Sequence, residues 1–185
     1  MKITKQILAI GLFISLSGCA AMSVSECQTA NWSAIGEKDG SSGKERRLAQ
    51  YFKACSKADI MPSQSLYEQG YIRGQNYYCQ PNTIFYQALK GNANYQVCPV
   101  QRRSQLRPYY EVANDYYRAE RHYQQYQDHL MEYTRRASDM SLKPEERDRY
   151  LKKLNDLQRD SYRIESEYRD AIRKLEQFKY QHRLN

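Results

Sequence analysis

The sequence predicts an all-α protein, in which a small disulfide-stapled helical domain precedes a long antiparallel helical hairpin that forms a coiled coil. Three observations support this fold class. Four cysteines lie between residues 27 and 98, glycines recur at helical spacing between residues 36 and 74, and no glycine occurs from residue 106 onward. In that last region, apolar and tyrosine residues repeat at steps of three and four, the spacing of a helix face that packs on another helix.

The composition excludes several classes of protein. The chain has 185 residues, of which 41% are hydrophobic, 27% are charged and 18 are tyrosines. Apart from one N-terminal stretch, no segment is apolar enough to cross a bilayer, which excludes a polytopic membrane protein. With 5 prolines and 8 glycines, the chain is neither collagenous nor broadly disordered. Its length suits one or two small domains rather than a large cofactor-dependent enzyme.

The N-terminus has the three zones of a secretory signal. Two lysines occur within residues 1–5, residues 6–15 are mostly apolar, and the sequence Leu-Ser-Gly-Cys ends at Cys19. A small pair that leads directly into a cysteine resembles the bacterial lipobox. The resemblance implies a signal peptide at residues 1–18, cleavage before Cys19, diacylglycerol on its sulfur and a further acyl chain, such as palmitate, on its amine. The alternative is an ordinary signal peptide that contains a cysteine.

Three acyl chains would anchor the protein stably, whereas a single chain binds a membrane only reversibly. In this lipoprotein class an aspartate after the lipidated cysteine retains the protein in the inner membrane, and here Ala20 follows. We therefore expect an outer-membrane lipoprotein with its body in the periplasm, and residues 19–29 as its lipidated tether.

The formal net charge of +8 is a modest basic excess. A basic chain can bind nucleic acid, but a protein tethered outside the cytoplasm rarely meets it. The expected partners are the membrane, through the lipid anchor, and an envelope protein, lipopolysaccharide or peptidoglycan. As the reason for the basic excess itself, a generally solvated surface is favoured over a specific anionic partner.

Four cysteines remain once Cys19 is lipidated, and an even number in an oxidising compartment indicates two disulfides. Three pairings are possible. Cys27 would precede a first helix and Cys55 would end a second helix folded back on it, which favours Cys27–Cys55 and Cys79–Cys98, each stabilising the fold by about 3 kcal/mol. Zinc is the alternative, but no Cys-x-x-Cys or His-x-His spacing accompanies these residues. We predict no metal and no cofactor.

Residues 30–105 predict a small domain of three helices and an irregular cross-linked loop, with helices near residues 30–42 and 63–78. Glycine costs nearly 1 kcal/mol in a helix relative to alanine, so matching glycine faces indicate two backbones in close contact. Charged neighbours exclude a lipid environment for this pair. The glycines on these faces are Gly36, Gly40, Gly43, Gly70 and Gly74.

The stretch from Gly36 to Gly40 also suggests a phosphate-binding loop, but it lacks both glycine-rich nucleotide patterns and follows no strand. Glu37 and Asp39 are candidates for an acid and a base. No other titratable group is paired with them at a readable spacing, so we interpret both as surface charges of the helix. No catalytic residue is assigned.

Cysteines, glycines and aromatic residues recur together in a recognisable order over residues 19–110. The residues that carry it are Cys27, Trp32, Ile35, Gly36, Asp39, Gly40, Gly43, Cys55, Pro62, Tyr67, Gly70, Gly74, Tyr78, Cys79, Asn82, Tyr95, Cys98 and Pro99. This order resembles an uncharacterised family of proteobacterial lipoproteins, domain of unknown function 2799. The resemblance implies location and disulfides, but no activity. Family members often carry a histidine near the position of Tyr51 and a glycine near that of Ala88.

Residues 106–185 predict the hairpin. A turn at residues 141–143 separates its arms, and Pro144 opens the second helix with two glutamates near the positive end of its dipole. We call the face on which each arm packs against the other the seam. In the first arm the seam residues are Tyr109, Val112, Tyr116, Ala119, Tyr123, Tyr126, Leu130, Tyr133, Ala137 and Met140. The second arm carries Tyr150, Leu154, Leu157, Ser161, Ile164, Tyr168, Ala171, Leu175 and Phe178.

Antiparallel pairing aligns residues whose numbers sum to 287, so that Ala119 faces Tyr168 and Tyr126 faces Ser161. Tyrosines then oppose small residues in several layers, which favours a seam of even width within one chain. Each arm would be about 50 Å long. Pairing of the hairpin between chains, giving a homo-oligomer, is the alternative.

The histidines His122, His129 and His182 lie largely off the seam. Asp115 is placed to join His122, but solvation of both side chains is favoured over a metal site. The leading hypothesis is a non-enzymatic structural or interaction module of the cell envelope. The alternative is an envelope enzyme or ligand-binding protein with a pocket around the glycine-faced helices.

Overall fold

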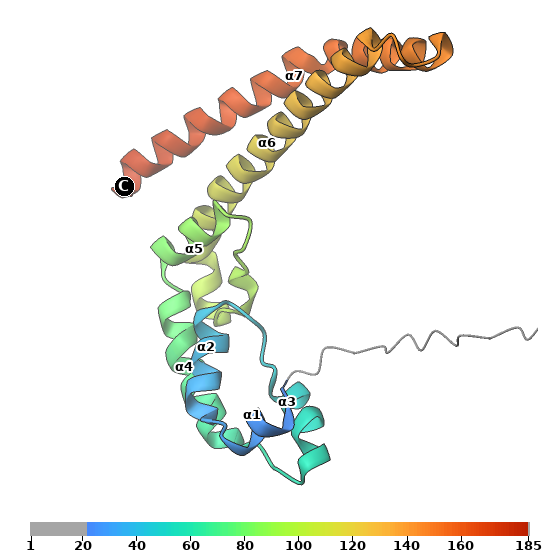
Figure 1. Cartoon of the computed structure of the whole chain (residues 1–185). Coiled ribbons are helices and arrows are strands. Elements are labelled where there is room, and N and C mark those ends of the chain that lie inside the picture. The colour runs from blue at the N-terminus through green and yellow to red at the C-terminus, as the bar shows by residue number, and fades with distance from the viewer. Residues whose placement is uncertain (1–21, 185) are drawn as a thin grey trace, which may run out of the picture.

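The computed structural model describes residues 22–184 (Figure 1). The signal peptide expected at residues 1–18 and the expected lipidation site Cys19 lie outside this range. Within it the chain forms seven α-helices and two short 3₁₀-helices, with no strand, so the all-α prediction is confirmed. None of the helices in this range is both long and apolar enough to cross a bilayer.

The N-terminal part contains five of the helices. They are α1 (Val24–Gln28), α2 (Trp32–Ser41), α3 (Leu48–Cys55), α4 (Gln64–Tyr78) and α5 (Pro81–Ala88), together with η1 (Ser56–Ala58) and η2 (Tyr95–Val97). The start of α2 is fixed by Asn31, whose side chain accepts a hydrogen bond from the Ala34 N–H at 3.0 Å. Helices α2 and α4 agree with the expected positions to within about two residues, and α3 ends at Cys55 as expected.

The segment expected to be an irregular loop contains α5. Pro81 occupies the first turn of this helix, where its missing N–H costs nothing. Ile84, Phe85 and Ala88 are fully buried on one face of α5. The expectation of an irregular loop was therefore wrong over residues 81–88, because burial of this short apolar face stabilises a helix.

The hairpin consists of α6 (Val100–Ser138) and α7 (Pro144–His182), each with 39 residues and about 58 Å long. The long helix pair predicted from the seam is confirmed. Helix α6 begins at Val100, runs through the exposed Pro108 and buries Leu106 against the second disulfide. That burial offsets the backbone hydrogen bond that Pro108 removes.

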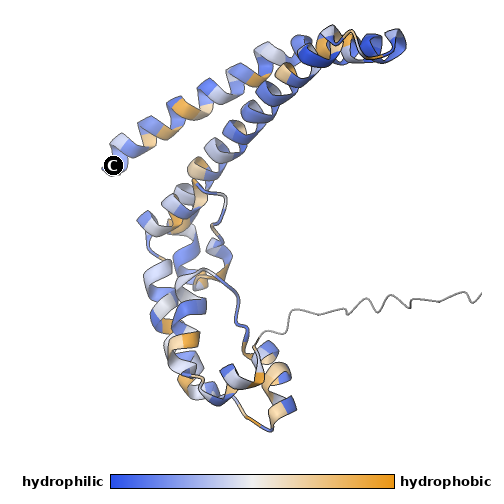
Figure 2. Cartoon of the chain, in the orientation of Figure 1, coloured by the Kyte–Doolittle hydropathy of each residue, from blue (hydrophilic) through white to orange (hydrophobic). Residues whose placement is uncertain are grey.

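The hairpin is fixed to the N-terminal part at its base. Leu175 of α7 and Leu184, which follows the end of that helix, form one cluster with Phe85, Ala88 and Ala113. The ring of Phe178 stacks on that of Phe85. Figure 1 shows the hairpin tip at one end of the molecule and helices α1 and α3 at the other. In Figure 2 both arms are coloured mainly hydrophilic, and apolar colour gathers around α3 and the helix junctions.

Candidate functional site

The glycine-faced helices α2 and α4 run in the same direction and touch backbone to backbone. A Cβ atom added to Gly36 would overlap the carbonyl oxygen of Tyr67, and one added to Gly70 would overlap that of Ser33. One turn later the same holds for Gly40 and Gly74. The predicted close crossing is confirmed. It leaves no space for a ligand, which weighs against a pocket between these helices.

Gly43 has a different role from the one expected. It follows α2 rather than lying on its glycine face, and its φ of 66° is in the left-handed region. A Cβ there would overlap the ring of Tyr78. Gly43 therefore ends the helix and admits a buried tyrosine, for which the sequence spacing of three gave no sign.

Asp39 is the centre of a buried polar cluster, with only 3% of its surface exposed. Its carboxylate accepts hydrogen bonds from the hydroxyls of Tyr51 at 2.8 Å and Tyr67 at 3.1 Å. The Nζ of Lys44 lies 3.8 Å from its other oxygen. The interpretation of Asp39 as a surface charge was wrong, because its two tyrosine partners come from α3 and α4 and lie far from it in sequence.

Glu37 differs from Asp39 although it is two residues away. Its side chain is about half exposed and pairs with Arg73 of α4 at 3.2 Å. The surface assignment of Glu37 is therefore confirmed. The two carboxylates do not form an acid and base pair.

The tyrosines around Asp39 are held in the protonated state. Burial, reinforced by the hydrogen bond to Asp39, raises the pKa of Tyr51 to about 12. Burial also raises the pKa of Tyr67 above its ordinary value. Both phenols therefore donate hydrogen bonds to the carboxylate at neutral pH. Such a cluster stabilises the fold, whereas an acid or base that transfers protons near pH 7 needs a pKa close to 7.

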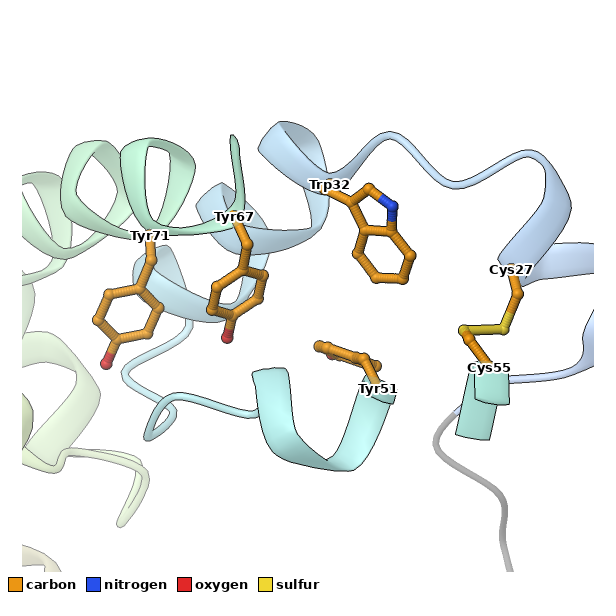
Figure 3. Close-up of a cluster of buried hydrophobic side chains, with 6 residues drawn as sticks. All are labelled: Cys27, Trp32, Tyr51, Cys55, Tyr67 and Tyr71. Atoms are coloured by element: carbon orange, nitrogen blue, oxygen red, sulfur yellow. A yellow bond between two sulfur atoms is a disulfide. The ribbon is translucent and has the colours of Figure 1, made fainter. Parts of the chain in front are cut away.

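Aromatic rings continue the cluster through the domain core (Figure 3). The rings of Trp32, Tyr51, Tyr67 and Tyr71 follow one another at centroid separations of 6.0, 6.0 and 6.1 Å. Figure 3 shows the disulfide beyond Trp32 and Tyr51. The hydroxyl of Tyr71 donates to the Lys44 carbonyl at 2.7 Å. Helices α2, α3 and α4 are thus joined by aromatic rings, and the three tyrosine hydroxyls among them all have hydrogen-bond partners.

Both disulfides have the pairing expected from the sequence. Cys27 is joined to Cys55 and Cys79 to Cys98, and all four residues are at least 98% buried. The first disulfide ties α1 to α3, and the second ties the end of α4 to the residue two before α6. The cysteines of the described range therefore form structural disulfides.

A pocket of about 240 Å³ lies beside the Asp39 cluster, next to α1. Three cationic side chains converge on it, with two carboxylates and several less polar groups. Its lining residues are Met22, Glu26, Ile35, Lys38, Asp39, Lys44, Arg47 and Tyr51. Sequence reasoning missed this pocket, because its walls come from α1, α2, α3 and the loop between α2 and α3.

A larger groove of about 550 Å³ lies between the arms of the hairpin, and the small residues Ala119 and Ala171 are part of its lining. Its lining residues are Val112, Asp115, Arg118, Ala119, His122, Glu167, Asp170, Ala171 and Lys174. The predicted register is confirmed here, since Tyr168 lies between Tyr116 and Tyr123, with ring centroids 6.1 and 4.7 Å away.

The three histidines are spread along the hairpin. His122 lies in the groove, where its Nδ1 is 3.6 Å from Glu167. His129 stacks on Tyr133 at 5.3 Å, and His182 meets the Tyr109 hydroxyl at 3.0 Å at the hairpin base. Over residues 22–184, no three His, Cys, Asp or Glu side chains are placed to hold a metal ion.

Comparison with known proteins identifies one domain. Residues 31–115 match the model of a family described as "Protein of unknown function (DUF2799)". The match covers the glycine crossing, the Asp39 cluster, both α4 and α5, and the beginning of α6. The outer part of the hairpin lies beyond it. No curated protein and no solved structure matches the chain.

Proposed function

We propose that the domain at residues 31–115, which matches a family model of unknown function, supports the hairpin of an envelope lipoprotein. In this proposal Cys19 anchors the protein in the outer membrane and the body lies in the periplasm. The hairpin then binds another envelope component, which is a protein, lipopolysaccharide or peptidoglycan. The protein acts as an interaction module rather than an enzyme.

The observation that carries this proposal is the surface of the hairpin. Each arm has 39 residues, yet the buried residues are only Leu106, Ala113 and Tyr126 in α6 and Ile164 and Leu175 in α7. Burial of so few side chains stabilises the fold little for its length. The exposed remainder carries large side chains, including Met131, Met140 and Tyr162, which are 65–80% exposed.

The position of the N-terminal end also supports the proposal. Met22, the first described residue, packs on the cluster that contains the first disulfide. Helices α1 and α3, which that disulfide joins, lie at the opposite end of the molecule from the hairpin tip (Figure 1). A lipid three residues before Met22 would hold this end at the membrane and direct the tip away from it.

The arrangement of the domain core disfavours the enzyme alternative. The glycine-faced helices have no cleft between them, and the buried carboxylate is saturated by protonated tyrosines and a lysine. An active site needs polar groups that converge on an open cavity. The groove of about 550 Å³ lies between α6 and α7, and it belongs to the proposed binding element.

The test is a hairpin shortened by two heptads in each arm. Removal of residues 124–137 and 150–163 keeps the antiparallel register, the turn and the base of the hairpin. It shortens each arm by about 21 Å. Cross-linking in intact cells should capture a partner with the full chain and lose it with the shortened one. Retention of the same partner by a shortened, folded and disulfide-bonded protein would contradict the proposal.

Two further measurements address the other parts of the proposal. Mass spectrometry of the mature protein should find a triacylated N-terminal Cys19, whereas an uncleaved and unmodified N-terminus would contradict the anchoring. Light scattering of the chain without its anchor should report a monomer, since the seam is filled within one chain. A stable dimer would favour self-assembly instead.

A further inference from the structure

The distance between the expected lipid and the folded body is short. Only Ala20 and Ala21 separate Cys19 from Met22, and an extended chain spans at most about 3.6 Å per residue. Met22 therefore lies within roughly 11 Å of the Cys19 Cα atom. Met22 also packs against the Cys27–Cys55 cluster, so the surface around it must lie near the lipid headgroups of an anchored protein.

The 240 Å³ pocket opens at this end, since Met22 and Glu26 form part of its wall. Lys38, Lys44 and Arg47 also line it. Among residues 22–184, Lys38 and Arg47 have no salt-bridge partner, and Lys44 has only the 3.8 Å contact with Asp39. The Arg47 guanidinium lies 5.5 Å from the centre of the Tyr51 ring and donates to Gln50.

The two carboxylates of the pocket are already engaged. Asp39 accepts both tyrosine hydroxyls, and Glu26 accepts the backbone N–H of Ser23 at 2.7 Å in the capping box of α1. That hydrogen bond lowers the pKa of Glu26, which keeps it ionised and bound to the helix start. The three cations of the pocket outnumber its two carboxylates, and Lys38 and Arg47 form no salt bridge with either carboxylate.

We propose that this pocket binds the phosphate of an anionic phospholipid headgroup, with Lys38, Lys44 and Arg47 as the ligands of its oxygens. Cationic side chains form the strongest hydrogen bonds to phosphate, and an anionic membrane surface attracts each basic residue near it. Met22 and Ile35 line the same pocket and would contact the less polar glycerol region. This inference rests on the proposed anchoring and adds a second contact that fixes the tilt of the body.

The test uses the chain from Met22 onward, which holds both disulfides and all the helices of the described range. Binding is measured by flotation with vesicles of phosphatidylcholine, alone and mixed with phosphatidylglycerol. The double variant Lys38→Gln/Arg47→Gln should bind the mixed vesicles roughly 30-fold more weakly. The control Arg149→Gln/Lys152→Gln removes the same charge from exposed positions near the start of α7, at the end of the molecule opposite the pocket, and it should lose less than about threefold.

Each other outcome overturns the proposal. Equal losses in the two double variants would mean that diffuse charge, not the pocket, attracts the membrane. No binding of the unaltered chain to mixed vesicles would exclude headgroup recognition. Displacement from vesicles by inorganic phosphate, but not by sulfate at equal ionic strength, would assign the pocket to free phosphate. Because this chain lacks Cys19, the result is independent of lipidation, which the mass of the mature protein reports separately.

Discussion

Two helix pairs dominate this protein, and they are built on opposite principles. Helices α2 and α4 run parallel and meet through glycines, so that backbone lies on backbone. Helices α6 and α7 run antiparallel and are held apart by tyrosine rings, with a groove where alanines replace them. The first pair fixes one geometry and leaves no room for substitution. The second tolerates change and keeps most of its surface available for contacts.

The largest effect is expected from a methyl group in the glycine crossing. Gly70→Ala places a Cβ against the Ser33 carbonyl, and neither backbone can yield without moving a helix. We expect a loss of about 3 kcal/mol in the free energy of unfolding, at the upper end for overpacked interiors. Urea unfolding monitored by circular dichroism measures this. The neighbouring exposed residue supplies the control, Gln69→Ala, which should change stability by less than about 0.5 kcal/mol.

A large-to-small change in the hairpin should cost less than a small-to-large change in the crossing. Ile164 is 4% exposed in the seam, and Ile164→Ala should lower the free energy of unfolding by about 2 kcal/mol. Because the two arms can move together and partly fill the cavity left by the removed side chain, this loss of stability is at the lower end of the range for a buried isoleucine. Hydrogen exchange should locate the loss in α6 and α7. The exposed Leu151 gives the control Leu151→Ala, and an equal loss there would mean that the seam does not hold the arms.

The same contrast explains which parts of the fold could be predicted from the sequence. The hairpin register was predictable because it depends on local periodicity, and Tyr168 lies opposite Ala119 as the spacing required. The glycine crossing was predictable because glycine within a helix is costly unless a backbone approaches. Its parallel direction was not, since glycine spacing carries no polarity.

The polar core could not be predicted for a physical reason. Asp39 stands in a helix of mostly polar residues, and its burial depends on Tyr51 and Tyr67, which are 12 and 28 residues away. No periodic pattern relates these positions. The same is true of the 240 Å³ pocket, whose walls come from separate elements. Helix α5 was missed because it is short. The few apolar residues of such a helix, close to a cysteine, form no periodic pattern that distinguishes them from the residues of a loop.

Removal of one hydroxyl from the polar core should have a smaller effect, with a distinct pH dependence. Tyr51→Phe removes one donor to Asp39 and should cost about 1 kcal/mol at pH 7. The pKa of Tyr51 is about 12, above its ordinary value of 10.0. Its stabilisation is therefore full below pH 10 and lost as the pH rises through 12.

Unfolding midpoints in urea at several pH values check this expectation. The curves for the unaltered chain and for Tyr51→Phe should differ at pH 7 and converge between pH 10 and 12. Tyr180 is 89% exposed, and Tyr180→Phe should follow the unaltered chain throughout. Parallel curves for the unaltered chain and Tyr51→Phe would mean that the hydroxyl of Tyr51 is not the group that links this domain to pH.

The smallest effect is expected for the ion pair that crosses the hairpin groove. His122 and Glu167 belong to different arms, but their side chains are 45% and 49% exposed. Exposed pairs are screened by water and contribute little, so Glu167→Gln should change stability by less than about 0.5 kcal/mol. The matched control is Glu165→Gln, whose partner Arg169 lies on the same helix. Equal small changes in both would show that side-chain packing, not this ion pair, holds the arms, and that the charges of the groove are available to a partner. A much larger loss for Glu167→Gln would make the groove a structural contact and remove it from the proposed binding surface.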